Sequence, residues 1–169
     1  MKKALLIIAA IGFRDEEYFV PKDILEQNNI KVITASTIKG LCTGKLGRTT
    51  ISDITLNEIK PEEYDGVFFI GGPGSYDYFN NAAAHTILKN AVKQNKIVGG
   101  ICAGAAILAH AGILKGKKAT SFSGVQDDLK ANGATYTGTG LEIDGNIITS
   151  DGPHSADKFG NAIAKALNG

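Results

Sequence analysis

Apolar runs of strand length alternate with amphipathic stretches along the 169 residues of the chain. Residues 4–10 form a continuous apolar run, which is typical of a strand buried on both faces. Further strands are predicted over residues 30–35, 64–70, 97–101 and 118–122. Helices are predicted over residues 15–28, 82–94, 103–111, 125–131 and 155–167. The pattern also predicts a small hairpin or excursion over residues 41–51, and a hairpin over residues 141–149 that turns at Asp144-Gly145.

Strands that alternate with helices predict an α/β fold, with a mainly parallel sheet and helices on both of its faces. The length suits one domain over residues 1–169, and we find no internal repeat. Ligands of such sheets bind beyond the carboxyl ends of the strands. We therefore expect residues 71–74, Cys102 and residues 151–154 to meet at one edge of the sheet.

Composition and charge exclude several classes of protein. The 18 basic and 17 acidic residues give a net charge of +1, without a basic stripe, so no nucleic-acid partner is expected. No apolar run approaches the length that spans a membrane. Charged residues follow the first apolar run at once, so a buried strand explains it better than a secretory signal does. Two cysteines are too few for a disulfide scaffold, which indicates a cytoplasmic protein, and Cys42 is interpreted as a packing or surface thiol.

The spacing Gly100-x-Cys102-x-Gly104 is that of a nucleophile elbow, with sulfur in place of the usual serine oxygen. A strand that turns sharply into a helix leaves no room for side chains two residues to either side of the nucleophile. The turn also places Cys102 at a helix N-terminus, where free N–H groups and the helix dipole favour the thiolate. A buried, inert cysteine is the alternative. The elbow spacing favours the reactive interpretation.

A glycine-rich loop, Gly71-Gly72-Pro73-Gly74, follows another apolar strand. Such a loop can present N–H groups to an anion, as an oxyanion hole or a phosphate cradle, or it can be only a tight turn. The chain has neither a Walker motif nor G-x-G-x-x-G, so no nucleotide cofactor is expected. The N–H groups of Gly72 and Ala103 are the candidate oxyanion donors, and Gly71 is a candidate contact to substrate.

Glu17 shares a helical face with apolar residues at positions 20, 21 and 24. A carboxyl group there should have a raised pKa or a specific partner, and it could move protons beside Cys102. The pattern alone favours a solvated first helical turn instead, because carboxylates are rarely buried without a partner. His154 follows the last strand at the same edge as Cys102, which makes it a candidate acid–base partner. The histidines and cysteines lack zinc-type spacing, so no metal site is expected.

Short segments spread over nearly the whole chain resemble the ThiJ/PfpI superfamily, and most closely its protein deglycase branch. These segments include Lys3-Ala4-Leu5-Leu6-Ile7, Asp15-Glu16-Glu17, Tyr64-Asp65, Ile101-Cys102-Ala103-Gly104, Leu108-Ala109-His110 and Thr149-Ser150. The resemblance implies a flavodoxin-like three-layer α/β sandwich and a homodimer.

The resemblance also implies roles for individual residues. Cys102 matches the reactive, oxidisable cysteine of the family, and Glu17 matches the buried glutamate that holds a proton against the sulfur. Gly72 and Ala103 match the backbone donors beside the cysteine. Arg48, which would otherwise be an ordinary surface arginine, matches one that approaches the neighbouring subunit's site in the family dimer.

Two positions depart from the pattern of the family. Ala103 stands where the peptidase-like branch has a histidine, which argues against an intracellular protease. Phe122 lies in the segment where the deglycase branch has a histidine, and a phenyl ring cannot transfer protons.

Three functions are therefore weighed. In the first, Cys102 adds without a cofactor to a small carbonyl compound such as methylglyoxal, in a glyoxalase-like or deglycase-like reaction, and Glu17 moves the protons. In the second, the protein senses oxidative stress, or acts as a chaperone, through oxidation of Cys102. The third is an amidase or amidotransferase that uses Cys102, His154 and Asp157; it requires His154 to reach the sulfur.

Overall fold

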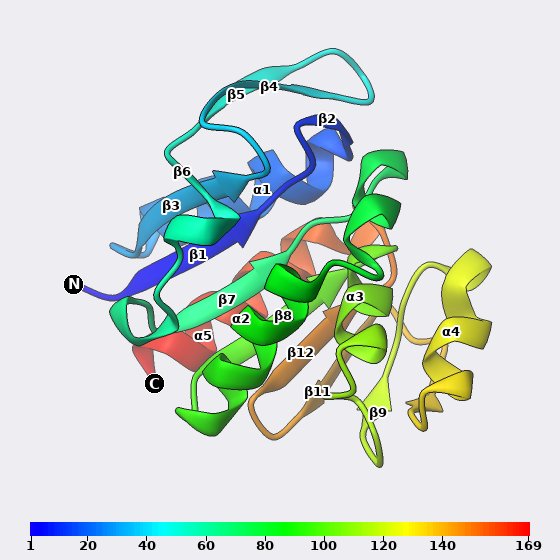
Figure 1. The fold of residues 1–169 in the computed structure, drawn as a ribbon. Helices are drawn as coiled ribbons and strands as arrows, with labels where there is room; N and C mark the ends of the chain where they lie inside the picture. Colours follow the sequence, from blue (N-terminus) through cyan, green and yellow to red (C-terminus); the bar gives the residue numbers. More distant parts are fainter.

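A seven-stranded sheet runs through the centre of the molecule, and the computed structural model describes all 169 residues (Figure 1). In spatial order the strands are β11 (Leu141–Asp144), β12 (Ile147–Ser150), β8 (Ile97–Ile101), β7 (Gly66–Phe69), β1 (Lys3–Ile7), β3 (Lys31–Ser36) and β6 (Ile54–Thr55). Neighbouring strands are parallel, except for β11, which forms an antiparallel hairpin with β12. This arrangement confirms the mainly parallel sheet.

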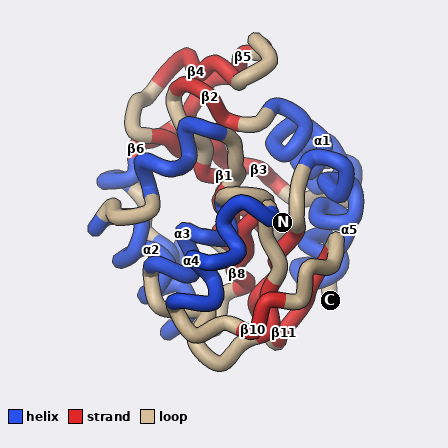
Figure 2. Tube along the Cα trace, turned by 90° about the vertical axis from the view of Figure 1, so that its right-hand side faces the viewer, coloured by secondary structure: helices blue, strands red, loops and turns tan.

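Helices cover both faces of this sheet (Figures 1 and 2). One face carries α1 (Asp15–Gln27) and α5 (Ala156–Asn168), and the other carries α2 (Ala82–Lys93), α3 (Gly104–His110) and α4 (Gln126–Ala131). Successive side chains of β1 point to opposite faces, so Leu6 packs in the α1–α5 core and Leu5 in the core under α2 and α3. The three-layer sandwich is therefore confirmed.

A second, three-stranded sheet lies beside the central one. It consists of β2 (Ile11–Phe13), β4 (Gly40–Gly44) and β5 (Thr49–Ser52). The hairpin expected within residues 41–51 is present as β4 and β5, and Cys42 is fully buried in it. No strand was predicted at residues 11–13, where β2 pairs with β4 some thirty residues later in the chain. Such long-range pairing leaves no local signal.

Two other expectations need adjustment. The strand expected over residues 118–122 is only β9 (Lys118–Ala119), and it pairs with β10 (Thr135–Tyr136) outside the central sheet. The second hairpin turns at residues 145–146, because Asp144 still pairs with Ile147. Gly145 takes the required positive φ of 61°. The remaining ordered segments are the 3-10 turns η1 (Leu56–Glu58), η2 (Pro61–Glu63), η3 (Pro73–Tyr78), η4 (Ser123–Val125) and η5 (Pro153–Ser155).

The carboxyl ends of β7, β8 and β12 lie at one edge of the sheet, and the segments that follow them face a shared pocket. None of the helices has the length and apolar character needed to cross a membrane.

Candidate functional site

Cys102 lies at the turn between β8 and α3. Its φ is 60°, a left-handed conformation that a side chain adopts only at a cost, and its N–H donates to the carbonyl oxygen of Ser150 over 2.9 Å. A Cβ atom at Gly104 would collide with the carbonyl oxygen of Phe69, and one at Gly100 would lie 2.7 Å from the carbonyl oxygen of Gly104. The crowding expected of a nucleophile elbow is therefore present.

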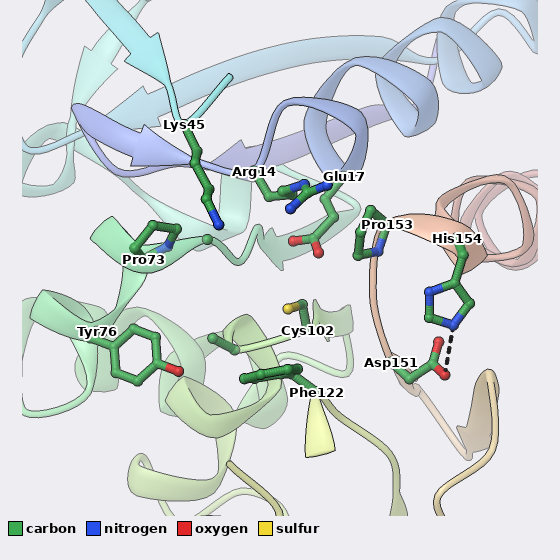
Figure 3. Close-up of a pocket in the computed structure, with 12 residues that line it drawn as sticks. Arg14, Glu17, Lys45, Pro73, Tyr76, Cys102, Phe122, Asp151, Pro153 and His154 are labelled. Carbon is green, nitrogen blue, oxygen red and sulfur yellow. Dashed lines mark hydrogen bonds and ion pairs between the residues drawn. The ribbon is translucent and has the colours of Figure 1, made fainter. Parts of the chain in front are cut away.

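A pocket of about 420 Å³ opens over Cys102 (Figure 3). Its lining residues come from six parts of the chain and are Arg14, Glu17, Lys45, Gly72, Pro73, Tyr76, Cys102, Ala103, Phe122, Asp151, Pro153 and His154. The edge predicted for a mainly parallel sheet thus contains the glycine-rich loop, the elbow and the last loop.

Glu17 enters this pocket from the first turn of α1 and is completely buried. Its Oε1 accepts the N–H of Gly71 over 3.0 Å, whereas the buried Oε2 has no hydrogen-bond partner. Burial is the largest cause that raises the pKa of Glu17, from its ordinary 4.5 to about 8. The solvated alternative is therefore wrong for Glu17, which holds a proton at neutral pH.

The thiol of Cys102 is the second acidic group of the pocket. Its burial, and then the charge of ionised Glu17, raise the pKa of Cys102 to about 12. The N–H groups of Ala103 and Gly72 lower that pKa, as the start of α3 was expected to do, but burial outweighs them. At neutral pH the carboxyl group of Glu17 is largely protonated. It can therefore donate a hydrogen bond to the sulfur of Cys102.

In the glycine-rich loop, Gly71 and Gly72 direct their N–H groups to different partners. Because Gly71 gives its N–H to Glu17, it positions that carboxyl group and is not free to bind an oxyanion. Gly72 has a φ of 104°, which favours glycine, and its N–H acts on the sulfur together with that of Ala103. These two donors match the pair expected from the sequence.

His154 lies at the rim of the pocket, where Figure 3 shows its ring turned toward Asp151. The ring nitrogen Nε2 is 3.1 Å from Oδ2 of Asp151, and 72% of the side chain is exposed. Asp157 is exposed on α5 and does not line the pocket. The structure therefore does not assemble a Cys102–His154–Asp157 triad.

Three lining residues were not identified from the sequence, and they are Arg14, Lys45 and Tyr76. Arg14 forms a two-pronged ion pair with Glu16, while Tyr76 and Phe122 supply aromatic walls. Lys45 extends into the pocket from the turn between β4 and β5 (Figure 3). Arg48, from the same turn, instead stacks on the ring of Phe19 at 3.6 Å, so its approach to a second subunit stays a prediction. Only spatial proximity identifies Lys45, since nothing in its local sequence marks it.

The other two histidines do not line the pocket. His85 bonds to the carbonyl oxygen of Phe79, and His110 bonds to Asp128. No group of three or more His, Cys, Asp or Glu side chains is arranged to hold a metal ion.

Comparison with known proteins gives consistent results. The model of the DJ-1/PfpI family matches residues 2–166. An uncharacterized protein of Methanocaldococcus jannaschii is 40% identical over 98% of this chain and 82% of its own length. A protein of Thermococcus kodakarensis that is named a deglycase is 36% identical over 88% of this chain and 90% of its own. The crystal structure of a ThiJ/PfpI domain protein from Brachyspira murdochii superposes with a TM-score of 0.96, at 33% identity, covering 98% and 96% of the two chains.

Proposed function

The chain belongs to the DJ-1/PfpI family, and from this premise we propose that it acts on small reactive carbonyl compounds. Cys102 is the nucleophile, Glu17 moves the protons, and no cofactor takes part. The observation that carries the proposal is the buried Oε2 of Glu17, which has no hydrogen-bond partner and belongs to a side chain that lines the same pocket as Cys102. The deglycase name of the Thermococcus kodakarensis relative supports the same class of substrate.

The first step is addition of the thiol to the aldehyde carbon of methylglyoxal. The C–S bond forms as the C=O double bond breaks, and the thiol proton passes to the aldehyde oxygen by way of Glu17, which gives a hemithioacetal. The N–H groups of Gly72 and Ala103 stabilise the charge that develops on that oxygen. A neutral carboxyl group can donate its proton at this stage, which is why the raised pKa of Glu17 suits the reaction.

The second step moves the proton on the former aldehyde carbon to the adjacent ketone carbon, and the hydroxyl proton of the hemithioacetal to the ketone oxygen. The first carbon is oxidised to a thioester and the second is reduced to an alcohol, so no external oxidant or reductant is needed. Water then hydrolyses the thioester, which releases lactate and restores the thiol. Because Phe122 cannot carry a proton, Glu17 serves both transfers.

Production of lactate from methylglyoxal by the purified protein tests this proposal. We expect turnover that is lost in Cys102→Ala and retained in Cys42→Ala, since Cys42 is fully buried outside the pocket. Equal rates in the two variants, or no turnover by the unaltered protein, would contradict the proposal.

Oxidation of Cys102 is the second candidate function, and one observation favours it. Phe122 replaces the second acid–base group that turnover would use, whereas a sulfinate needs only hydrogen-bond donors, which Gly72, Ala103 and neutral Glu17 provide. The protein would then act as a sensor of oxidative stress or as a chaperone. Mass spectrometry after mild peroxide treatment should find the added oxygen atoms on Cys102 and not on Cys42; the reverse order would exclude this role.

Three further proposals come from the sequence: the first two from its length and its cysteines, and the third from its resemblance to the family. Residues 1–169 form one domain, the protein works in the cytoplasm, and two copies form a homodimer. Exposed apolar side chains on the second sheet, Ile11, Leu41 and Ile51, support a covered surface there. Light scattering coupled to size-exclusion chromatography measures the mass in solution, and a monomer would contradict the dimer.

A further inference from the structure

Two cationic side chains, those of Arg14 and Lys45, reach the pocket from the side of α1 and β4 (Figure 3). They differ in how their charge is balanced. Arg14 donates from Nε and Nη2 to the two oxygens of Glu16, over 3.1 and 2.9 Å. The amine of Lys45 forms neither an ion pair nor a hydrogen bond within the chain. Lys45 therefore brings an uncompensated positive charge to the pocket.

The turn that carries Lys45 is fixed by a buried carboxylate. Asp15 is 2% exposed, and its two oxygens accept the N–H groups of Leu46 and Arg48 over 2.8 and 2.9 Å. The N–H of Lys45 itself donates to the carbonyl oxygen of Phe13 over 2.8 Å. These bonds tie the turn to the start of α1, the helix that also carries Glu17. A loop held in this way presents its lysine at a defined place over the pocket.

None of the other charged groups of the pocket forms an ion pair with Lys45. Glu17 is neutral at pH 7 because burial raises its pKa to about 8. Glu16 is engaged by Arg14. Asp151 lies at the opposite rim, where its Oδ2 is 3.1 Å from Nε2 of His154. The side of the pocket beneath Lys45 is thus positively charged, and an anionic group of a bound substrate would complete it.

We propose that Lys45 binds a carboxylate of the substrate, so that the preferred substrates are 2-oxoaldehydes that carry a carboxylate rather than neutral dicarbonyls. This inference rests on the proposed function of Cys102, and it names the substrate class. Asp15 acts as a positioning residue, because it holds the turn without touching the substrate. Arg14 adds a weaker contribution, since Glu16 already balances its charge.

The test compares 4,5-dioxopentanoate with its methyl ester, which has the same dicarbonyl group and no charge. We expect kcat/KM to be about tenfold higher for the acid at low salt, the gain typical of one charged hydrogen bond. Lys45→Met should bring this ratio close to one, and Lys45→Arg should keep most of it. Lys89→Met on the exposed side of α2, outside the pocket, should leave the ratio unchanged. A ratio near one in the unaltered protein, or one that Lys45→Met does not change, overturns the inference.

A binding measurement keeps this inference separable from the proposed reaction. The Cys102→Ala protein is titrated calorimetrically with 4-oxopentanoate, which carries the carboxylate and cannot turn over. We expect binding that weakens about tenfold when Lys45→Met is added, and that weakens with added salt. If the unaltered protein shows no turnover but this binding is found, the reaction fails and the anion site stands. Absence of binding, or binding indifferent to Lys45, refutes the anion site.

Discussion

The carboxyl group of Glu17 is held by the backbone of Gly71, which donates its N–H to Oε1 over 3.0 Å and leaves the equally buried Oε2 without a partner. An additional Cβ at Gly71 would lie 2.7 Å from that Oε1 and 2.8 Å from the Cβ of Cys102. The glycine therefore allows the carboxyl group and the thiol to share one small space. Because Oε1 accepts a hydrogen bond, the proton of neutral Glu17 resides on Oε2, on the side that is free to serve the reaction.

Glu17→Gln separates the shape of this side chain from its proton. The amide oxygen can still accept the N–H of Gly71, but the amide cannot pass a proton between sulfur and substrate. We expect kcat/KM for methylglyoxal to fall by at least about 100-fold, the lower end of the usual contribution of general acid–base catalysis. Lactate release measures the rate, and Asp23→Asn on the exposed side of α1 is the control. A Glu17→Gln protein with full activity would eliminate the proposed shuttle.

The raised pKa of Glu17 also predicts how stability depends on pH. The unfolded chain releases this proton near pH 4.5 and the folded chain only near pH 8, so between these values the folded state holds more protons. The free energy of unfolding should therefore decrease as the pH rises through this window, by at most about 1.4 kcal/mol per pH unit from this group. Urea unfolding at several pH values measures it.

Glu17→Gln supplies the reference for that measurement, because it cannot ionise. The unaltered protein should lose stability relative to the variant as the pH rises from about 4.5 to 8, as the linkage of a raised pKa requires. A constant difference between the two proteins across this range would show that Glu17 is not a buried acid of raised pKa.

Local patterns were sufficient for the elbow and for six of the seven strands of the central sheet, all but β6. Apolar runs identify buried strands because those strands are apolar on both faces. The spacing around Cys102 marks two glycines at which a Cβ atom would meet backbone atoms. The same reasoning located the loop of Gly72 at the edge where β7 ends. The burial of Glu17 was predicted by the resemblance to the family. The pattern of apolar positions alone favoured a side chain exposed to solvent.

The parts that the sequence did not reveal depend on contacts between distant segments. The position of Lys45 is set by Asp15, thirty residues earlier, and both residues taken alone are ordinary surface types. His154 reaches the expected edge, but its exposed ring pairs with Asp151, a local contact that the strand order does not determine. β2 has no local signal in the sequence because its partner, β4, lies some thirty residues later.

Phe122→His tests whether proton transfer limits the reaction. The Phe122 side chain is 42% exposed, and in Figure 3 it lies on the other side of Cys102 from Glu17. An imidazole there would supply a second acid–base group near neutral pH, so we expect kcat for methylglyoxal to rise about tenfold or more. Phe122→Asn, which is polar but does not titrate, is the matched control. An equal increase in both variants would point to access of water and not to proton transfer.

Gly104→Ala tests the packing on which the elbow depends. The new methyl group would meet the carbonyl oxygen of Phe69 at the end of β7, and this backbone atom cannot move without disturbing the central sheet. We expect a loss of more than about 3 kcal/mol in the free energy of unfolding, or failure to fold, because overpacking against backbone is among the costly substitutions.

Gly152→Ala is the control: its φ of 166° is ordinary extended backbone, and its Cβ would lie 3.5 Å from the nearest atom, in His154. Denaturant unfolding should show a change below about 1 kcal/mol for this control. Equal stability of the two variants would mean that α3 can move away from the ends of β7 and β8 without cost. Close packing at the elbow would then not explain the left-handed conformation of Cys102.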